Sequence, residues 1–282
     1  MLKEANEGNA LAQATIGFMY ENGLNIVKDE SKAAHYYKQS ATQGLAFAQS
    51  SIGNLYDEGR GVMQNKNYAR EWYEKAVQQQ CAYAQLSLGM LYLLGSDDMP
   101  IDENKAASYI FQSANQGFTF ACWMAGYFYL DGLGGTSINN ENAVNMFKKA
   151  ATKGFLPAQY ELGMIFSTGI MWVDEIVGIS KDSTEAMYWM AKAAHNNDIR
   201  AQAEIAKWYA QGKNTRKYED EAVKWWYKAA KQGDAESQHI IGEIYIEGSY
   251  GIKKDYEEGI SWIRMSANQG NDYAKHVLKR YI

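Results

Sequence analysis

Residues 46–62 read AFAQSSIGNLYDEGRGV, and this arrangement of alanine, glutamine, glycine and tyrosine returns along the whole chain. The position held here by Ala48 recurs 36 or 37 residues later each time, except for one interval of 43 residues. Its occupants are Ala12, Ala48, Ala84, Ala121, Ala158, Ala201, Ser237 and Ala274. A fixed period of this length indicates a repeat protein in which each repeat is one small supersecondary unit.

A glycine lies eleven residues after this position in all seven full repeats, and helices commonly end at a glycine. These glycines are Gly23, Gly59, Gly95, Gly132, Gly169, Gly212 and Gly248. Another glycine and an aromatic residue lie five and eight residues after the recurring position, and Ala206 is the internal exception to that glycine. Each repeat therefore predicts a first helix of about 13 residues that ends at a glycine.

A second helix is predicted in each repeat from small residues spaced on one helical face. It starts after Asp or Asn, which cap helix starts well, except in the sixth repeat, where Tyr218 holds that place. We expect one column of large residues to pack between neighbouring helix pairs. This column holds Tyr36, Trp72, Tyr109, Met146, Trp189, Trp225 and Trp262.

The complete unit resembles the Sel1-like repeat, a relative of the tetratricopeptide repeat, and the resemblance covers nearly the whole chain. It implies an all-α, right-handed αα-solenoid of about seven helix-turn-helix repeats with terminal partial repeats. We expect one solenoid over residues 1–282. Its parts are a partial repeat at 1–9, repeats at about 10–44, 45–80, 81–117, 118–154, 155–197, 198–233 and 234–270, and a capping helix at 271–282.

Composition excludes several classes of protein. With 46% hydrophobic and 22% charged residues, the chain is typical of globular proteins, and no apolar run approaches the roughly 18 residues of a membrane span. The first four residues lack an apolar core, so we expect no signal peptide there. The net charge of −5 and the lack of a basic stripe disfavour nucleic-acid binding, and Cys81 and Cys122 cannot form a disulfide framework.

No pattern in the sequence indicates catalysis. The four histidines are scattered, and the hydrolase, metalloprotease and nucleotide-binding motifs are missing. His239 and His276 hold equivalent places in successive first helices, so we expect them to be neighbours. A metal would need more ligands than these and Glu243. We therefore expect no enzyme, no cofactor and no metal.

The resemblance implies a non-catalytic scaffold or adaptor that binds a partner protein or peptide. A second hypothesis is a dedicated inhibitor, such as an immunity protein that neutralises a secreted bacterial toxin. Tight binding of one folded partner would favour the inhibitor, and weak binding of several peptides the adaptor. Oligomeric state and compartment, bacterial cytoplasm or periplasm, stay open.

In tetratricopeptide relatives the first helices line the inner face, and carrying their positions over makes the middle of that face apolar and aromatic. The candidate partner-binding residues are Tyr83, Leu86, Met90, Phe120, Trp123, Tyr127, Tyr160 and Met164. The fifth repeat also carries six extra residues within 170–178, among them Trp172. The inner-face residues either bind a partner or pack between repeats, and the insertion either folds back or contacts a partner.

Overall fold

The computed structural model describes residues 1–96, 99–170 and 178–281, and over these residues the chain is helical apart from two isolated β-bridges. This confirms the all-α repeat fold. The helices in the described residues are α1 (Leu2–Asn6), α2 (Ala10–Asn22), α3 (Glu30–Thr42), α4 (Ala46–Glu58), α5 (Lys66–Gln78), α6 (Ala82–Leu94), α7 (Glu103–Asn115), α8 (Thr119–Asp131), α9 (Asn140–Thr152), α10 (Leu156–Thr168), α11 (Ser183–His195), α12 (Ile199–Gln211), α13 (Glu219–Lys231), α14 (Ala235–Glu247), α15 (Tyr256–Asn268) and α16 (Asp272–Tyr281).

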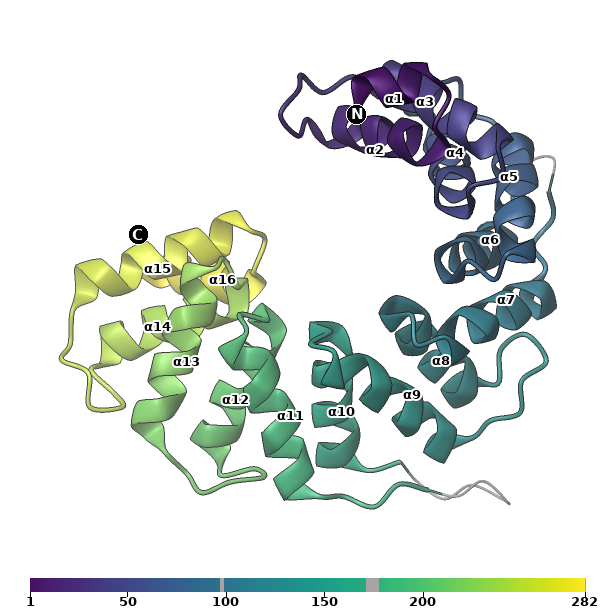
Figure 1. Cartoon of the computed structure of the whole chain (residues 1–282). Coiled ribbons are helices and arrows are strands. Elements are labelled where there is room, and N and C mark those ends of the chain that lie inside the picture. The colour runs from purple at the N-terminus through teal and green to yellow at the C-terminus, as the bar shows by residue number, and fades with distance from the viewer. Residues whose placement is uncertain (97–98, 171–177, 282) are drawn as a thin grey trace. The chain divides into compact units, whose positions relative to one another are not determined.

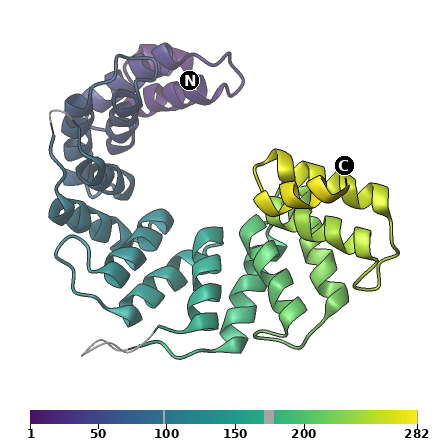
Figure 2. The ribbon, with the colours of Figure 1, turned by 180° about the vertical axis from the view of Figure 1, so that it is seen from behind.

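The helices group into two compact units, unit 1 (Met1–Ala150) and unit 2 (Ala151–Ile282). In unit 1, α2, α4, α6 and α8 lie side by side as one layer, and α3, α5 and α7 lie behind them (Figure 1). We call the exposed side of the first layer the inner face of unit 1. In unit 2, α10 to α16 follow one another as the green-to-yellow helices of Figure 2, and neighbours in the chain pack together.

The predicted helix ends are present in the structure. Gly59 ends α4 with φ 72°, in the left-handed region where glycine has no steric penalty. Asn65 begins α5 by accepting a hydrogen bond from the Tyr68 amide at 2.9 Å. Tyr218 begins α13 without a side-chain cap, as its sequence indicates. Sequence reasoning missed that Asp198 and other polar residues also cap first helices.

In the first helix of every full repeat except α12, which has Ala206 at this position, an internal glycine lies close against the second helix. A Cβ atom at Gly53 would lie 2.7 Å from the Tyr73 ring, and one at Gly126 would lie 2.6 Å from the Phe147 ring. Those rings are completely buried. The residues that pack against these glycines lie one position after the column that the sequence predicted. The buried residues at this position are Tyr37, Tyr73, Ile110, Phe147, Met190, Trp226 and Ile263.

The predicted column itself is buried unevenly. Trp189, Trp225 and Trp262 are at most 8% exposed. Trp72 is only half-buried, with the Lys75 ammonium 4.1 Å from its ring centre. The predicted packing between neighbouring helix pairs holds for the three buried tryptophans. It also holds for Trp72, which packs against the core cluster that contains Ile52 and Leu55 while its outer side stays accessible.

Buried glutamines link consecutive helix pairs. The side-chain amide of Gln202 donates to the Ala194 carbonyl at 3.1 Å, and its oxygen accepts from Gln232 at 2.7 Å. Gln159 donates to the Ala151 carbonyl at 2.9 Å, but its own buried oxygen has no hydrogen-bond partner. The linkage thus has two hydrogen bonds at Gln202 and one at Gln159.

The insertion of the fifth repeat begins and ends at a backbone bridge. The Ile170 and Ile179 backbones exchange two hydrogen bonds, of 2.8 and 2.9 Å. Residues 171–177 lie outside the described part of the chain, and Trp172 is among them. Among the helices that the structure describes, none is both long and apolar enough to cross a membrane.

Candidate partner-binding surfaces

The predicted binding residues lie on first helices of both units. Tyr83, Leu86 and Met90 belong to α6, whereas Phe120, Trp123 and Tyr127 belong to α8, all in unit 1. Tyr160 and Met164 belong to α10 in unit 2. Tyr83 is 39% exposed and Leu86 only 6%, so Leu86 lies in the core and offers little surface. The other six are half-buried.

The α8 residues form an aromatic cluster, which we define as Phe120, Trp123 and Tyr127. The ring centres of Phe120 and Trp123 lie 5.3 Å apart, and those of Trp123 and Tyr127 lie 5.2 Å apart. Tyr127 meets the buried Phe147 ring edge-on at 5.2 Å. These contacts hold partly exposed rings against the core, so the α8 aromatic cluster combines packing with an accessible surface.

In unit 2, Tyr160 lies beneath a cation. The Arg200 guanidinium is 4.5 Å from the centre of the Tyr160 ring and 3.1 Å from an oxygen of Asp198. Burial raises the pKa of the Tyr160 hydroxyl, and the charge of Glu204 raises it further. The surface around Tyr160 is thus partly covered by an arginine that an acidic residue holds in place.

A pocket of about 380 Å³ opens on the inner face of unit 1, between α2, α4 and α6. We call it the Glu21 pocket. Its lining residues are Phe18, Glu21, Tyr37, Phe47, Ser50, Ser51, Asn54, Cys81 and Tyr83. Phe18 and Phe47 are 42% and 48% exposed, more than Tyr83. The candidate list omitted both, although Phe47 holds the same helical position as Tyr83 and Phe18 the same position as Met90.

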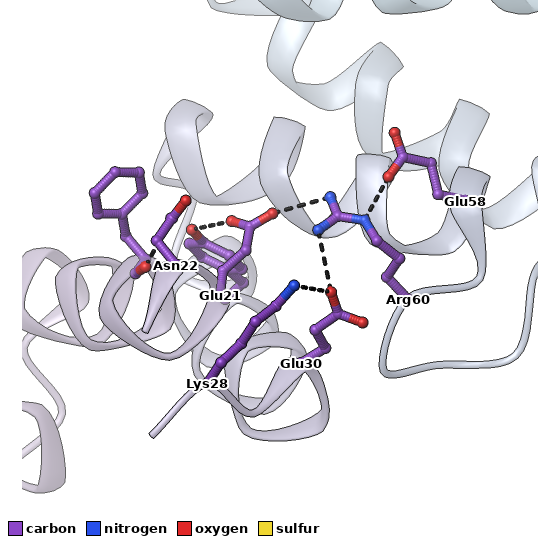
Figure 3. Close-up of polar contacts among 8 residues, drawn as sticks. Glu21, Asn22, Lys28, Glu30, Glu58 and Arg60 are labelled. Carbon is purple, nitrogen blue, oxygen red and sulfur yellow. Dashed lines mark hydrogen bonds and ion pairs between the residues drawn. The ribbon is translucent and has the colours of Figure 1, made fainter. Parts of the chain in front are cut away.

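Glu21 is held in the pocket wall by two donors. The Tyr37 hydroxyl donates to one carboxylate oxygen at 2.8 Å, and the Arg60 guanidinium donates to the other at 2.9 Å. Arg60 also contacts Glu30 at 3.6 Å and pairs with Glu58, as Figure 3 shows. Burial raises the pKa of Tyr37, and its hydrogen bond to Glu21 raises it further, so this hydroxyl remains a donor at neutral pH.

The position of Arg60 follows from the glycine after it. Gly61 has φ 66°, and a Cβ there would lie 2.2 Å from the Glu30 backbone, so only glycine fits. The Ser31 hydroxyl donates to the Gly61 carbonyl at 3.2 Å. The loop after α4 therefore lies against the first turn of α3, and this contact brings Arg60 to Glu21.

Unit 2 has a pocket of about 390 Å³ between α14 and α16. His239 and His276 both line it, which agrees with their expected proximity. His239 lies 3.5 Å from the Glu243 carboxylate, and its ring centre lies 6.2 Å from that of the Tyr273 ring, with the two planes tilted by 31°. Within the described residues, no group of three or more histidine, cysteine or acidic side chains is arranged to hold a metal ion.

Comparison with known proteins identifies the repeat. The Sel1 repeat family model matches residues 10–45, 46–81, 82–118, 119–155, 156–198, 199–234 and 235–271. No curated protein sequence matches the chain.

Two crystal structures are similar over 99% of this chain. A Sel1 repeat protein from Oxalobacter formigenes is 30% identical with a TM-score of 0.78, and the match covers 78% of that protein. The protein c5321, a protective antigen present in uropathogenic Escherichia coli strains, is 27% identical with a TM-score of 0.80, and the match covers 58% of it. The immunity protein Pa5087 from Pseudomonas aeruginosa is 15% identical, and the match covers 92% of this chain and 81% of that protein. Its TM-score of 0.42 is too low to support an inference.

Proposed function

The chain belongs to the Sel1 repeat family, whose members are generally non-catalytic interaction scaffolds, and on this premise we propose that it binds a partner protein through the inner face of unit 1. The observation that carries the proposal is the row of partly exposed large side chains on α4, α6 and α8. Its members are Phe47, Tyr83, Met90, Phe120, Trp123 and Tyr127. Apolar surface of this kind beside polar groups is typical of interaction sites.

The α8 aromatic cluster has the properties of an interface anchor. Trp and Tyr are enriched among the residues that dominate binding energy. Trp123 and Tyr127 are already fixed by mutual ring contact, and Tyr127 also packs on Phe147. Because rigid side chains lose little conformational entropy on association, more of their contact energy contributes to affinity. We assign the central contacts of the partner to this cluster.

Tyr160 and Met164 form a second, separate contact surface in this proposal. Both are half-buried on α10 of unit 2, where Arg200 already covers the Tyr160 ring. A partner contact there would replace or extend an existing cation–ring contact. We therefore expect Tyr160 and Met164 to contribute less than the α8 aromatic cluster.

The test is affinity capture from the source cell, with the chain as bait and quantitative mass spectrometry as the readout. Trp123→Ala and Tyr127→Ala should each weaken capture about 30-fold if they are hot spots, which corresponds to about 2 kcal/mol. The matched control is Tyr68→Ala, because Tyr68 is an aromatic residue of the second layer of unit 1 and is 52% exposed.

The proposal fails if Trp123→Ala and Tyr127→Ala capture the same proteins as strongly as the wild type and Tyr68→Ala do. Thermal melts of all three variants must show that each still folds. A single tightly bound partner would mean an inhibitor of that partner, and several weakly bound partners would mean an adaptor.

A further inference from the structure

The Glu21 pocket combines exposed aromatic rings with a carboxylate. Three aromatic rings that are each 39–48% exposed surround it, and Glu21 is the one ionised side chain among its described lining residues. We propose that this pocket receives an arginine side chain of the partner protein, with the guanidinium at Glu21 and the aliphatic stem against Phe18, Phe47 and Tyr83. The inference rests on the proposed function, because it specifies the chemistry of the partner on the same face.

An arginine matches each wall of the pocket. Its planar guanidinium stacks on aromatic faces and pairs with carboxylates, while its three methylene groups cover apolar surface. A cation over an aromatic face gains further attraction from the ring electrons. Asn54 and Ser51 also line the pocket and supply polar oxygens that can accept the remaining N–H groups.

The carboxylate of Glu21 is already oriented to accept such a group. Its side chain is 18% exposed, and Tyr37 and Arg60 fix the directions of its two oxygens. Arg60 shows that a guanidinium fits against this carboxylate at 2.9 Å. Each carboxylate oxygen accepts more than one hydrogen bond, so a second guanidinium can bind without removing the first.

The charges around the pocket leave negative charge in excess. The ion-pair network that includes Glu21 contains the carboxylates of Glu21, Glu30 and Glu58 and the cations of Lys28 and Arg60 (Figure 3). The carboxylates therefore outnumber the cations by one. Burial raises the pKa of the Tyr83 hydroxyl, and a hydrogen bond with Ser87 lowers it. The charges of Glu58 and Glu21 raise the pKa, and the charge of Arg60 lowers it. The excess carboxylate of this ion-pair network favours a cation at the pocket wall.

A neutral apolar side chain fits this pocket less well. It would cover the Glu21 carboxylate and remove its remaining water without supplying a new donor. Burial of an ionised group without added pairing is unfavourable. An arginine supplies both the apolar contact and the donor, so the pocket selects for charge as well as size.

The experiment titrates the full-length, ¹⁵N-labelled chain with the peptide Ac-Gly-Gly-Arg-Gly-Gly-NH₂ and follows amide resonances by NMR. The matched probe replaces arginine by citrulline, which has nearly the same shape without the charge. We expect the arginine peptide to shift the resonances of Phe18, Phe47 and Tyr83 with a millimolar Kd. The citrulline peptide should bind at least about fivefold more weakly, because charge-assisted hydrogen bonds are roughly twice as strong as neutral ones.

Two variants test the pocket itself. Glu21→Gln should remove the preference for arginine over citrulline, and Asn54→Phe, which fills the pocket without altering its charge, should abolish binding of both peptides. The control is Glu247→Gln, an exposed residue of α14 in unit 2, which should leave the preference unchanged. If Glu21→Gln unfolds, the ratio of arginine to citrulline affinity in the wild type tests the charge preference, and Asn54→Phe tests whether both peptides bind in this pocket.

Equal binding of the two peptides, no binding of either, or an unchanged preference in Glu21→Gln would overturn the inference. Free arginine binding more tightly than the peptide would also overturn it, because the site would then serve a small molecule. The titration needs no natural partner and no change in the α8 aromatic cluster. Its failure is therefore distinguishable from failure of the capture experiment.

Discussion

The glutamine linkages make a stability prediction that compares two equivalent buried residues of unit 2. Gln159 and Gln202 are 0% and 1% exposed, and each donates to the carbonyl of a preceding helix end. The oxygen of Gln202 also accepts from Gln232, whereas the oxygen of Gln159 is buried without a partner. Replacement by methionine keeps the length of the side chain and removes its polar groups at both positions.

The two substitutions should differ in cost. Gln202→Met removes two hydrogen bonds, each with a net value of about 1 kcal/mol, so it should lower the free energy of unfolding by about 1–3 kcal/mol. Gln159→Met removes one such bond but also removes a buried oxygen without a partner, whose desolvation costs about 1–3 kcal/mol. It should therefore be nearly neutral or stabilising. The helix-end carbonyls keep a backbone donor in both cases, Gly154 at 3.0 Å and Asn197 at 3.1 Å.

The assay is urea unfolding of both variants and the wild type, followed by far-ultraviolet circular dichroism. We expect Gln202→Met to be less stable than Gln159→Met by about 2 kcal/mol with equal dependence on urea concentration. Because the gain in apolar character is the same at both sites, it cancels in this difference. Equal losses, or a larger loss for Gln159→Met, would refute the assignment of a second hydrogen bond at Gln202.

Three further outcomes follow from the packing and the charges. Trp225→Ala should lower the free energy of unfolding by about 3–5 kcal/mol, because Trp225 is 5% exposed. Trp72→Ala should lower it clearly less, because Trp72 is only half-buried. Equal losses in calorimetric or urea unfolding would contradict this difference in burial. In Gly126→Ala, the clash with the Phe147 ring should lower the free energy of unfolding by about 1–3 kcal/mol. The higher helix propensity of alanine should offset roughly 1 kcal/mol of this loss. A double-mutant cycle with Phe147→Leu should recover part of that cost, and strict additivity would argue against the clash. The raised pKa of Tyr37 stabilises the fold at every pH below the unfolded tyrosine value of 10.0, and this stabilisation is lost as the pH rises above that value. Tyr37→Phe should therefore lower the free energy of unfolding at pH ~7, because the hydrogen bond to Glu21 is lost, and should lower it less at pH ~11. An equal loss of stability at both pH values would show that Tyr37 does not titrate as described.

The sequence alone determined the helices, their order and their ends. Gly59 ends α4 through its own backbone conformation, and Asn65 begins α5 by a hydrogen bond to a backbone amide three residues away. The 3.6-residue period places small and large residues on one face of each helix. Such features depend on residues within a few positions of each other. The repetition of the pattern over seven units then identified the fold, because a chance match becomes less plausible with every repeat.

The tertiary structure decided which side chains are accessible and which charges meet. Tyr83 and Leu86 are three residues apart on α6, yet their exposed fractions are 39% and 6%, because α6 packs unequally on its neighbours. Glu21 and Arg60 meet across 39 residues only because Gly61 lets one loop lie against the helix of the preceding repeat. Burial and ion pairing depend on contacts between repeats, and a period read along one chain carries no information about how closely those repeats approach.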